Sequence, residues 1–321
     1  QPDPDLYYLT GYTEPEAVAV LAPFRTDAPF TFFVRPRDPE REVWTGPRGG
    51  TEAALAVFGA DEAYPIEELA DRLPAIISEA GAVYFRLGTG RDDVEALVRT
   101  SLIRAQRGRQ REGRGPRTLV DPGAILDDMR LIKDAHEIAL LREAARVTAE
   151  AFREVAPRIR PGAGEWEIEA ALDAGFRRRG AAGPAFPSIV AAGANATVLH
   201  YTDNAAALEA GQLLLIDAGA RYHMYCGDIS RTFPISGAFS PAQRDVYNAV
   251  LAAHDAAIEL VRPGNTIEQV HDAALRVAIA ALIDLGVLRG TVDELIEKKE
   301  EYRPFLPHRT SHWLGLDVHD V

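Results

Sequence analysis

Cysteine is almost missing from this sequence, because its 321 residues include only one, Cys226. A single thiol excludes an internal disulfide framework, so we expect a protein of a reducing compartment, with the cytoplasm as the default. Long apolar runs are missing too, since none approaches the roughly 18 residues that suggest a membrane span. No secretory leader is recognisable. The sequence therefore predicts a cytoplasmic protein without a membrane partner.

Positive charge is in deficit, with 35 lysines and arginines against 48 aspartates and glutamates and a net charge of −13. This balance argues against nucleic acid as the main partner. One basic cluster opposes the trend, but it lacks the interleaved aromatic side chains that would stack on bases. We therefore interpret it as a solvated basic connector near a domain boundary rather than as an RNA contact. Its members are Arg104, Arg107, Arg109, Arg111, Arg114 and Arg117.

The length of the chain allows two domains, each with its own core. Up to residue 128, strand-like segments alternate with amphipathic helical segments, which is typical of a small α/β domain. We expect Trp44 on a glycine-rich loop of this domain, where an aromatic side chain more often fills a packing gap than contacts a ligand. The expected strands are residues 16–23, 30–34 and 82–87, and the expected helices are residues 66–80 and 92–103.

The second predicted domain, residues 129–321, contains a repeat. It opens with a helix whose start at Asp134, with Glu137 three residues later, has the capping-box pattern. Further on, a helix end, the tripeptide Arg-Pro-Gly and a helix closing in Ala-Ala-Leu occur twice, with their glycines at Gly162 and Gly264. Two copies at this spacing predict a domain of two related halves rather than a solenoid.

Strands should follow the two helices of each half. The sequence opens on Gln1 rather than on methionine and stops at Val321, soon after the strands of the second half should begin. Symmetry then predicts, beyond Val321, a second hairpin like the one of the first half that contains Asp217 and Asp228. We therefore expect the domain to be truncated at its C-terminal end. The expected strands are residues 188–193, 197–202, 212–219 and 224–233 in the first half and residues 308–320 in the second.

Two aspartates interrupt segments that otherwise have the composition of a core. Asp217 ends an apolar run, and Asp228 lies in the next expected strand. In an antiparallel hairpin with a two-residue turn at Tyr222 and His223, the two aspartates would face each other with β-carbons roughly 4.5–5.5 Å apart. Like charges so placed repel, and buried carboxylates are usually paired or bound to metal. A metal ion would supply the positive charge that this arrangement needs.

Two simpler interpretations stay open, because Asp217 could cap a turn and Asp228 could pair with Arg231. Histidines favour the metal instead, since four of the eight flank the expected strands of this region. Two aspartates with a histidine suit Mn(II), Co(II) or Zn(II). We interpret Cys226 as a small core residue. The four histidines are His200, His308, His312 and His319.

These segments resemble a known family. Residues 199–204 (LHYTDN), 214–234 (LLIDAGARYHMYCGDISRTFP) and 308–320 (HRTSHWLGLDVHD) are similar to signature segments of the Xaa-Pro aminopeptidases (aminopeptidase P) in the pita-bread metallopeptidase family. Prolidase, methionine aminopeptidase and creatinase are relatives. The likeness covers almost the whole chain, including residues 7–21. It implies a small creatinase-like N-terminal α/β domain followed by a pseudo-twofold α+β pita-bread catalytic domain.

The resemblance implies a cofactor of two divalent metal ions, with Mn(II) as the first choice and Co(II) or Zn(II) as alternatives. Asp217 would bind one ion, His312 would bind the other, and Asp228 would bridge the two. The family completes this site with two glutamates on later strands. The sequence as far as Val321 contains no match for them.

For the substrate, the resemblance implies contacts by three histidines. His319 is similar to the catalytic histidine at the scissile carbonyl, His200 to a second catalytic histidine that faces the proline side, and His308 to one that lines the proline pocket. Arg309 departs from the glycine of many relatives, which leaves the shape of this loop open. Trp44 matches a tryptophan that reaches a neighbouring subunit's site in tetrameric relatives, so a homo-oligomer, either a dimer or a tetramer, is expected.

The activity implied is hydrolysis of the N-terminal Xaa-Pro bond of peptides with proline at the second position. A hydroxide held by two ions roughly 3.5–4 Å apart would attack the carbonyl carbon, while a metal and His319 share the developing charge. Prolidase, with the same metals but a dipeptide substrate, is the nearest alternative. The alternative from another class is a metal-free pita-bread module that binds peptides or proteins without cleaving them.

Overall fold

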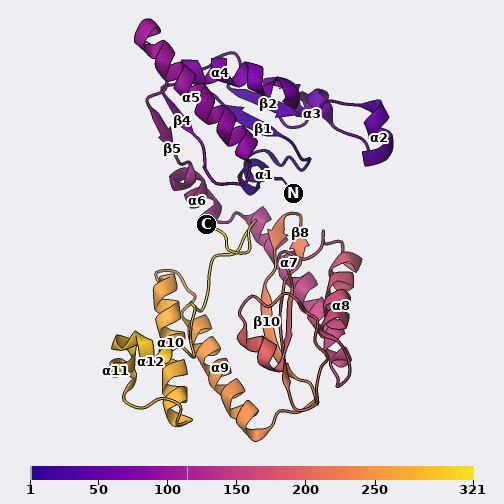
Figure 1. Ribbon diagram of the computed structural model, residues 1–321, viewed down its shortest axis with the longest axis vertical. Helices are drawn as coiled ribbons and strands as arrows, with labels where there is room; N and C mark the ends of the chain where they lie inside the picture. The colour runs from indigo at the N-terminus through magenta and orange to yellow at the C-terminus, as the bar shows by residue number, and fades with distance from the viewer. Residues whose placement is uncertain (1, 114) are drawn as a thin grey trace. The chain divides into compact units, whose positions relative to one another are not determined.

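The computed structural model describes residues 2–113 and 115–321, and within residues 110–112 it describes the backbone only. Two compact units make up the chain, residues 1–132 and 133–321 (Figure 1). Two members of the arginine cluster, Arg114 and the side chain of Arg111, lie outside the described part. Among the helices that the structure describes, none is both long and apolar enough to cross a membrane.

The N-terminal unit is built on a mixed three-stranded sheet. Its strands are β1 (Val18–Leu21), β2 (Phe30–Val34) and β3 (Glu62–Pro65). The central strand β2 is antiparallel to β1 and parallel to β3, and a separate parallel pair is formed by β4 (Ala82–Tyr84) and β5 (Thr118–Val120). This is the small α/β domain that the alternating segments predict. Its helices are α1 (Pro4–Thr10), α2 (Pro39–Thr45), α3 (Gly50–Ala56), η1 (Ile66–Glu68), α4 (Leu69–Glu79), α5 (Asp92–Glu112) and α6 (Gly123–Leu131).

Strand β2 is buried on both faces because its side chains alternate. Phe32 packs on one side, where its ring centroid lies 4.9 Å from that of Tyr12 in an edge-on contact. Phe33 packs on the other side, against Leu69 and Leu73 of α4. Both phenylalanines are fully buried. The period-two alternation of the strand therefore divides the hydrophobic core of this unit into two layers.

The arginine cluster forms part of helix α5, and the expectation of a connector is wrong for Arg104, Arg107 and Arg109. Three acidic residues in the first turn stabilise the helix start electrostatically, and arginine is a good helix former. The helix ends at Gly113, whose φ of 70° costs glycine little. The regular helix thus includes the first arginines of the cluster, while Arg117 lies beyond it.

Trp44 lies on helix α2, not in a loop. Asp38 caps this helix by accepting a hydrogen bond from the Arg41 amide, and Pro39 occupies the first turn. The glycines of the stretch begin only at Gly46, where the helix ends. Because 87% of its surface is exposed, Trp44 does not fill a packing gap in this unit, contrary to expectation.

In the C-terminal unit, a pair of helices packs against one face of an antiparallel sheet. Helix α7 begins with the expected capping box, in which the side chains of Asp134 and Glu137 each accept a hydrogen bond from the other's amide. Buried side chains of both helices and of the sheet form one hydrophobic core. The helices are α7 (Ala135–Val155) and α8 (Glu165–Arg178), joined by η2 (Ala156–Arg158), and the sheet order is β10 (Ile229–Pro234), β7 (Leu213–Ala218), β6 (Ile189–Ala192).

The Arg-Pro-Gly repeat corresponds to a repeated helix pair. Gly162 lies between α7 and α8 with a φ of 85°, and Gly264 lies between α9 and α10 with a φ of 95°. Glycine adopts this conformation without the strain that other residues would meet. Two related halves are therefore present, as predicted. The helices of the second half are α9 (Pro241–Glu259), α10 (Ile267–Asp284), α11 (Val292–Glu297) and α12 (Lys299–Tyr302).

Two segments expected as strands, residues 197–202 and 308–320, are not strands. The first begins at the end of the 3-10 helix η3 (Gly193–Thr197) and continues as a turn and irregular chain. The second is irregular throughout and is closed by local bonds such as that from the Asp320 amide to the Trp313 carbonyl. Backbone groups in both segments thus form hydrogen bonds outside a sheet ladder. Backbone N–H and C=O groups that are buried need such partners whether or not the chain is regular.

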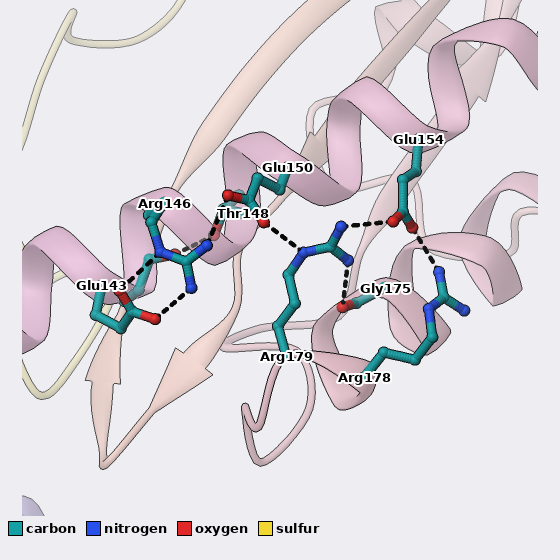
Figure 2. A network of polar contacts seen from close by, with 9 residues as sticks. Glu143, Arg146, Thr148, Glu150, Glu154, Gly175, Arg178 and Arg179 are labelled. Carbon is teal, nitrogen blue, oxygen red and sulfur yellow. Dashed lines mark hydrogen bonds and ion pairs between the residues drawn. The ribbon is translucent and has the colours of Figure 1, made fainter.

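An ion-pair network joins α7 to the end of α8 (Figure 2). Arg179 Nε lies 2.7 Å from Glu150 Oε2, and both Arg179 and Arg178 bind Glu154. Hydrogen bonds from Arg179 and then Arg178 lower the pKa of Glu154 to about 2. The resulting stabilisation is present above the unfolded-state pKa of about 4.3 and is lost as the pH falls towards 2. Because 37% of the Glu154 side chain is exposed, solvent and salt screen this contribution.

Thr148 connects the inner face of α7 to the hairpin of strands β7 and β10, residues 213–234, which contains Asp217 and Asp228 and is called the acidic hairpin below. Replacement of Thr148 gives a testable prediction. This buried hydroxyl donates to the Ala144 carbonyl at 2.7 Å and accepts from the Ala220 amide at 2.9 Å. Thr148→Val keeps the shape but leaves a buried amide without its partner. We expect the free energy of unfolding, measured by urea denaturation, to fall by about 1–3 kcal/mol.

The matched control for this prediction is Thr100→Val on helix α5. Thr100 makes the same bond to the carbonyl four residues earlier, at 2.7 Å to Ala96, but it is exposed. We expect a change within about 0.5 kcal/mol there. Equal unfolding midpoints for Thr148→Val and the unmodified protein would show that the Ala220 amide does not depend on the threonine.

Candidate metal centre

Asp217 lies on the central strand β7, on the face turned away from the helix pair. Three alternate residues of this strand, Leu214, Ile216 and Ala218, are fully buried in the core with α7 and α8. The intervening positions, which include Asp217, are half-buried. The aspartate therefore interrupts the apolar run because it belongs to the less buried face of the strand.

The register of the acidic hairpin differs from the predicted one. Its tight turn lies at His223 and Met224, whose φ values of 45° and 70° have the signs that a two-residue type I′ turn requires. As a result, the strand ladder pairs Asp217 with Ser230 rather than with Asp228. A turn shifted by one residue changes the pairing by two residues, and side chains two residues apart share a face. Asp228 thus stays beside Asp217 as a diagonal neighbour.

The two aspartates interact directly, and this contact overturns the simpler interpretations of them. Burial is the main cause that raises the pKa of Asp217, and the charge and hydrogen bond of Asp228 raise it further. A hydrogen bond from Ser230 Oγ at 2.9 Å lowers this pKa and so acts in the opposite direction. Asp217 lies inside a strand and does not cap a turn. Asp228 pairs with His312 rather than with Arg231.

The orientation of His312 indicates that a positive charge belongs between it and Asp228. Its Nδ1 lies 2.8 Å from the Trp313 carbonyl oxygen, which can only accept, so Nδ1 carries the ring proton. Its Nε2 lies 3.1 Å from Asp228 Oδ2. In a neutral ring this nitrogen would direct a lone pair at a carboxylate, so the contact requires a second proton or a metal ion. Metal-binding histidines commonly donate their other ring nitrogen to such a carbonyl.

The donor atoms suit a divalent ion, although these contacts do not enclose one. Two carboxylates and an imidazole nitrogen are oxygen and nitrogen donors of the kind that Mn(II), Co(II) and Zn(II) accept. Within residues 2–113 and 115–321, no group of three or more His, Cys, Asp and Glu side chains is arranged to hold a metal. Asp217 and His312 each interact with Asp228, and the charge of His312 also acts on Asp217. Asp228 is the shared partner, as a bridging ligand would be.

His319 lies next to this cluster, and a buried ion pair holds its segment in place. The ring centroids of His319 and His312 are 4.3 Å apart, with the ring planes at 72°. Lys133 Nζ lies 2.7 Å from Asp320 Oδ2, and only 1% of the Asp320 side chain is exposed. This ion pair fixes the residue after His319 to the start of α7. The sequence reasoning missed it because no local pattern links two residues so far apart.

Cys226 connects the acidic hairpin to the same segment. Its amide donates to the Gly315 carbonyl at 2.8 Å, and its thiol lies 3.4 Å from the Leu316 carbonyl oxygen. The cysteine is fully buried, as expected for a small core residue, and burial raises its pKa to about 11. The hairpin and residues 308–320 are thereby held together, which explains how His312 reaches Asp228.

In the described part of the C-terminal unit, neither His200 nor His308 makes a hydrogen bond or ion pair with the aspartates. His200 is exposed in the irregular segment after η3. His308 is exposed with Nδ1 2.7 Å from the Arg309 carbonyl oxygen, while the Arg309 guanidinium lies 2.9 Å from Glu268 of α10. Trp44 belongs to the N-terminal unit. Among the expected site residues that the structure describes in this unit, the close contacts therefore join Asp217, Asp228, His312 and His319.

Comparison with known proteins gives two family matches. The model of metallopeptidase family M24 matches residues 139–321. The model of the aminopeptidase P N-terminal domain matches residues 1–84. Both described units therefore contain a matched segment, and the one with the acidic hairpin matches the metallopeptidase model.

Individual proteins are similar over nearly the whole chain. The Xaa-Pro aminopeptidase of Haemophilus influenzae is 42% identical over 321 residues, which cover 99% of this chain and 71% of that protein. The structure of Pseudomonas aeruginosa aminopeptidase PepP superposes with a TM-score of 0.93 at 44% identity, covering 100% of this chain and 72% of that one. For zinc-substituted Escherichia coli aminopeptidase P in complex with product, the TM-score is 0.92 at 38% identity, covering 100% and 73%.

Proposed function

This chain belongs to metallopeptidase family M24, and from that premise we propose that it removes the first residue of peptides whose second residue is proline. It is a metallopeptidase hydrolase, and its family implies divalent metal ions. The single observation that carries the proposed substrate is the 42% identity, over 99% of the chain, to a protein named Xaa-Pro aminopeptidase.

The proposed metal ligands are Asp217, Asp228 and His312. Their support is the position of His312 Nε2 at 3.1 Å from Asp228 Oδ2, with Nδ1 directed at the Trp313 carbonyl oxygen, an arrangement that a metal ion between the two side chains would satisfy. Asp228, which contacts both other residues, would bridge two ions, with Mn(II) as the first choice and Co(II) or Zn(II) as alternatives. When bound, the ions would activate a water molecule for attack and polarise the scissile carbonyl.

The remaining steps fall to the side chains of this protein. His319, 4.3 Å from His312 between ring centroids, would donate a hydrogen bond to the scissile carbonyl oxygen as negative charge develops on it. His200 and His308 would contact the proline side of the substrate, and the imide ring would be selected by shape. Trp44 would reach the site of a neighbouring copy in a cytoplasmic homo-oligomer, and its 87% exposure leaves it accessible for such a contact.

Release of alanine from Ala-Pro-Ala tests the proposed function. The full-length protein with Mn(II) is expected to cleave this tripeptide, and a chelator should abolish cleavage because the activity depends on bound ions. The dipeptide Ala-Pro, measured in parallel, separates the two nearest activities. Cleavage of the dipeptide alone would favour a prolidase, and cleavage of neither with metal supplied would favour a non-catalytic binding module.

A further inference from the structure

Glu165 is a fully buried carboxylate that the proposed chemistry does not use. It is the first residue of helix α8 and is 0% exposed. Burying a charged group is costly unless hydrogen bonds replace its water. Here four donors do so, and none of them is a cation. They are the amides of Ala192 and Ala206, the side-chain amide of Asn195 and the hydroxyl of Tyr201.

The four donors lie on both sides of His200 in the chain. Glu165 Oε1 accepts from the Ala192 amide at 2.7 Å and from Asn195 Nδ2 at 3.1 Å, both before the histidine. Glu165 Oε2 accepts from the Tyr201 hydroxyl and from the Ala206 amide, each at 2.8 Å and both after it. One carboxylate therefore closes the two ends of the segment 193–206, which we call the His200 loop.

A second buried residue closes the same loop from within. Asn204 is 1% exposed, accepts from the Val190 amide at 2.9 Å and donates to the Ser188 carbonyl at 2.9 Å. Its φ of 46° is a backbone conformation that asparagine tolerates better than most residues. The loop is thus fixed along strand β6 at its base.

The tip of the His200 loop has the opposite character. Val198 and Leu199 are 55% and 53% exposed, and His200 is exposed next to them. Apolar side chains and an imidazole are therefore presented to solvent by a loop whose base is rigidly bonded. A loop without such a base would spread these three side chains over many conformations, at an entropic cost to any ligand that needs one of them.

The internal repeat indicates that the carboxylate is not needed to start the helix. Counted from the repeated glycines, the position in α10 that corresponds to Glu165 is Ile267. Helix α10 begins there with a capping box between Thr266 and Gln269 instead. Both helices form, but only the first half has the buried carboxylate, and only the first half has the His200 loop bonded to it.

We propose that Glu165 is a positioning residue that holds the His200 loop in the conformation in which His200 contacts substrate. This inference rests on the proposed function, because it takes the substrate to be a peptide with proline at its second position. Glu165 itself touches neither substrate nor metal. It acts through the loop, and its removal should therefore weaken substrate binding more than it slows turnover.

The variant Glu165→Gln tests this inference, because it keeps the size and replaces one acceptor oxygen by a donor that faces donors. For Ala-Pro-Ala we expect kcat/KM to fall about tenfold, mainly through a higher KM, with unchanged metal content. In a His200→Ala background the same substitution should cause almost no further loss, because the histidine it positions is gone. If the loss of kcat/KM in the double variant equals the product of the losses in the two single variants, the positioning role is overturned.

Hydrogen exchange gives a readout that does not depend on activity. The amides of Ala192 and Ala206 should exchange at least about tenfold faster in Glu165→Gln, while amides of the α7 core keep their protection. The matched control is Glu167→Gln, which removes the same charge from an exposed side chain in the same helical turn. It should change neither KM nor exchange. Unchanged exchange at both amides in Glu165→Gln would overturn the inference, whatever the activity.

Two further results keep this inference separate from other failures. If Glu165→Gln does not fold, Tyr201→Phe is the milder variant to test. It removes one of the four hydrogen bonds to Glu165 and keeps the ring, so KM should also rise, by a smaller factor. If the unmodified protein cleaves neither Ala-Pro-Ala nor Ala-Pro, the proposed function fails. The exchange of the Ala192 and Ala206 amides then still decides whether Glu165 holds the loop.

Discussion

Replacement of Asp228 by asparagine is expected to abolish metal retention and to lower kcat/KM for Ala-Pro-Ala by on the order of 10³-fold or more. Asp228 contacts both Asp217 and His312, so it is the one side chain that both proposed ions would share. Asparagine keeps the size but loses the charge, and its amide nitrogen cannot bind a cation. Metal content by mass spectrometry and initial rates with added Mn(II) measure the two effects.

The same variant should fold normally, which separates loss of the site from loss of the protein. In the presence of a chelator, the unfolding temperature of Asp228→Asn should stay close to that of the unmodified protein, since loss of the like charge beside Asp217 offsets the weakened contact with His312. Asp245→Asn, on the exposed side of helix α9, makes the same chemical change away from the site and should keep full activity. Full metal content and activity in Asp228→Asn would sink the bridging assignment.

Elements with local signals could be predicted from the sequence. The capping pair Asp134 and Glu137 marks the start of α7, and the structure contains that capping box. The apolar run that ends at Asp217 forms strand β7, and the repeated glycines Gly162 and Gly264 lie between matching helix pairs. In each case the residues that determine the element are its own neighbours in the chain, so a single sequence contains the information.

Features that depend on distant partners could not be predicted. Residues 197–202 have strand-like composition, yet Glu165, from another helix, accepts the hydrogen bonds that shape this loop. Residues 308–320 are held by Lys133 and by the buried Cys226 rather than by a neighbouring strand. Composition describes what a segment favours by itself, and a buried partner far away in the chain can override it.

The candidate site was predicted in its residue types but not in its register. A two-residue type I′ turn requires positive φ at both residues, and neither Tyr222–His223 nor His223–Met224 contains the glycine or asparagine that usually marks such a turn, so no local signal distinguishes the two registers. The resulting shift of two residues left Asp217 and Asp228 on one face, because side chains alternate with period two. The assignment of ligands therefore stays a prediction that rests on proximity and on the orientation of His312.

The close approach of two glycines in the acidic hairpin carries the second large prediction. A β-carbon added to Gly219 would lie 1.6 Å from the Gly227 carbonyl oxygen and 2.5 Å from its carbon. That carbonyl belongs to the backbone, and it cannot withdraw, because Gly227 is itself backed by α7. A β-carbon on Gly227 would meet Thr148 Oγ1 at 2.4 Å and the Ala144 carbonyl oxygen at 2.8 Å. Neither glycine therefore has room for a side chain, because Gly219 packs on Gly227 and Gly227 packs on helix α7.

Gly219→Ala is expected to lower the free energy of unfolding of the C-terminal unit by about 3 kcal/mol or more, since relief of the clash requires the hairpin to separate. Separation would break the 2.8 Å bond from the Gly227 amide to the Ala220 carbonyl and move Asp228 away from Asp217, so metal binding should fail as well. Gly81→Ala is the control, because a β-carbon there meets no atom within 4 Å and its φ is not positive. Urea denaturation compares the variants. Equal unfolding midpoints for Gly219→Ala and Gly81→Ala would mean that the two strands lie farther apart than the contact between Gly219 and Gly227 implies. The placement of Asp228 beside Asp217 would then lose its main support.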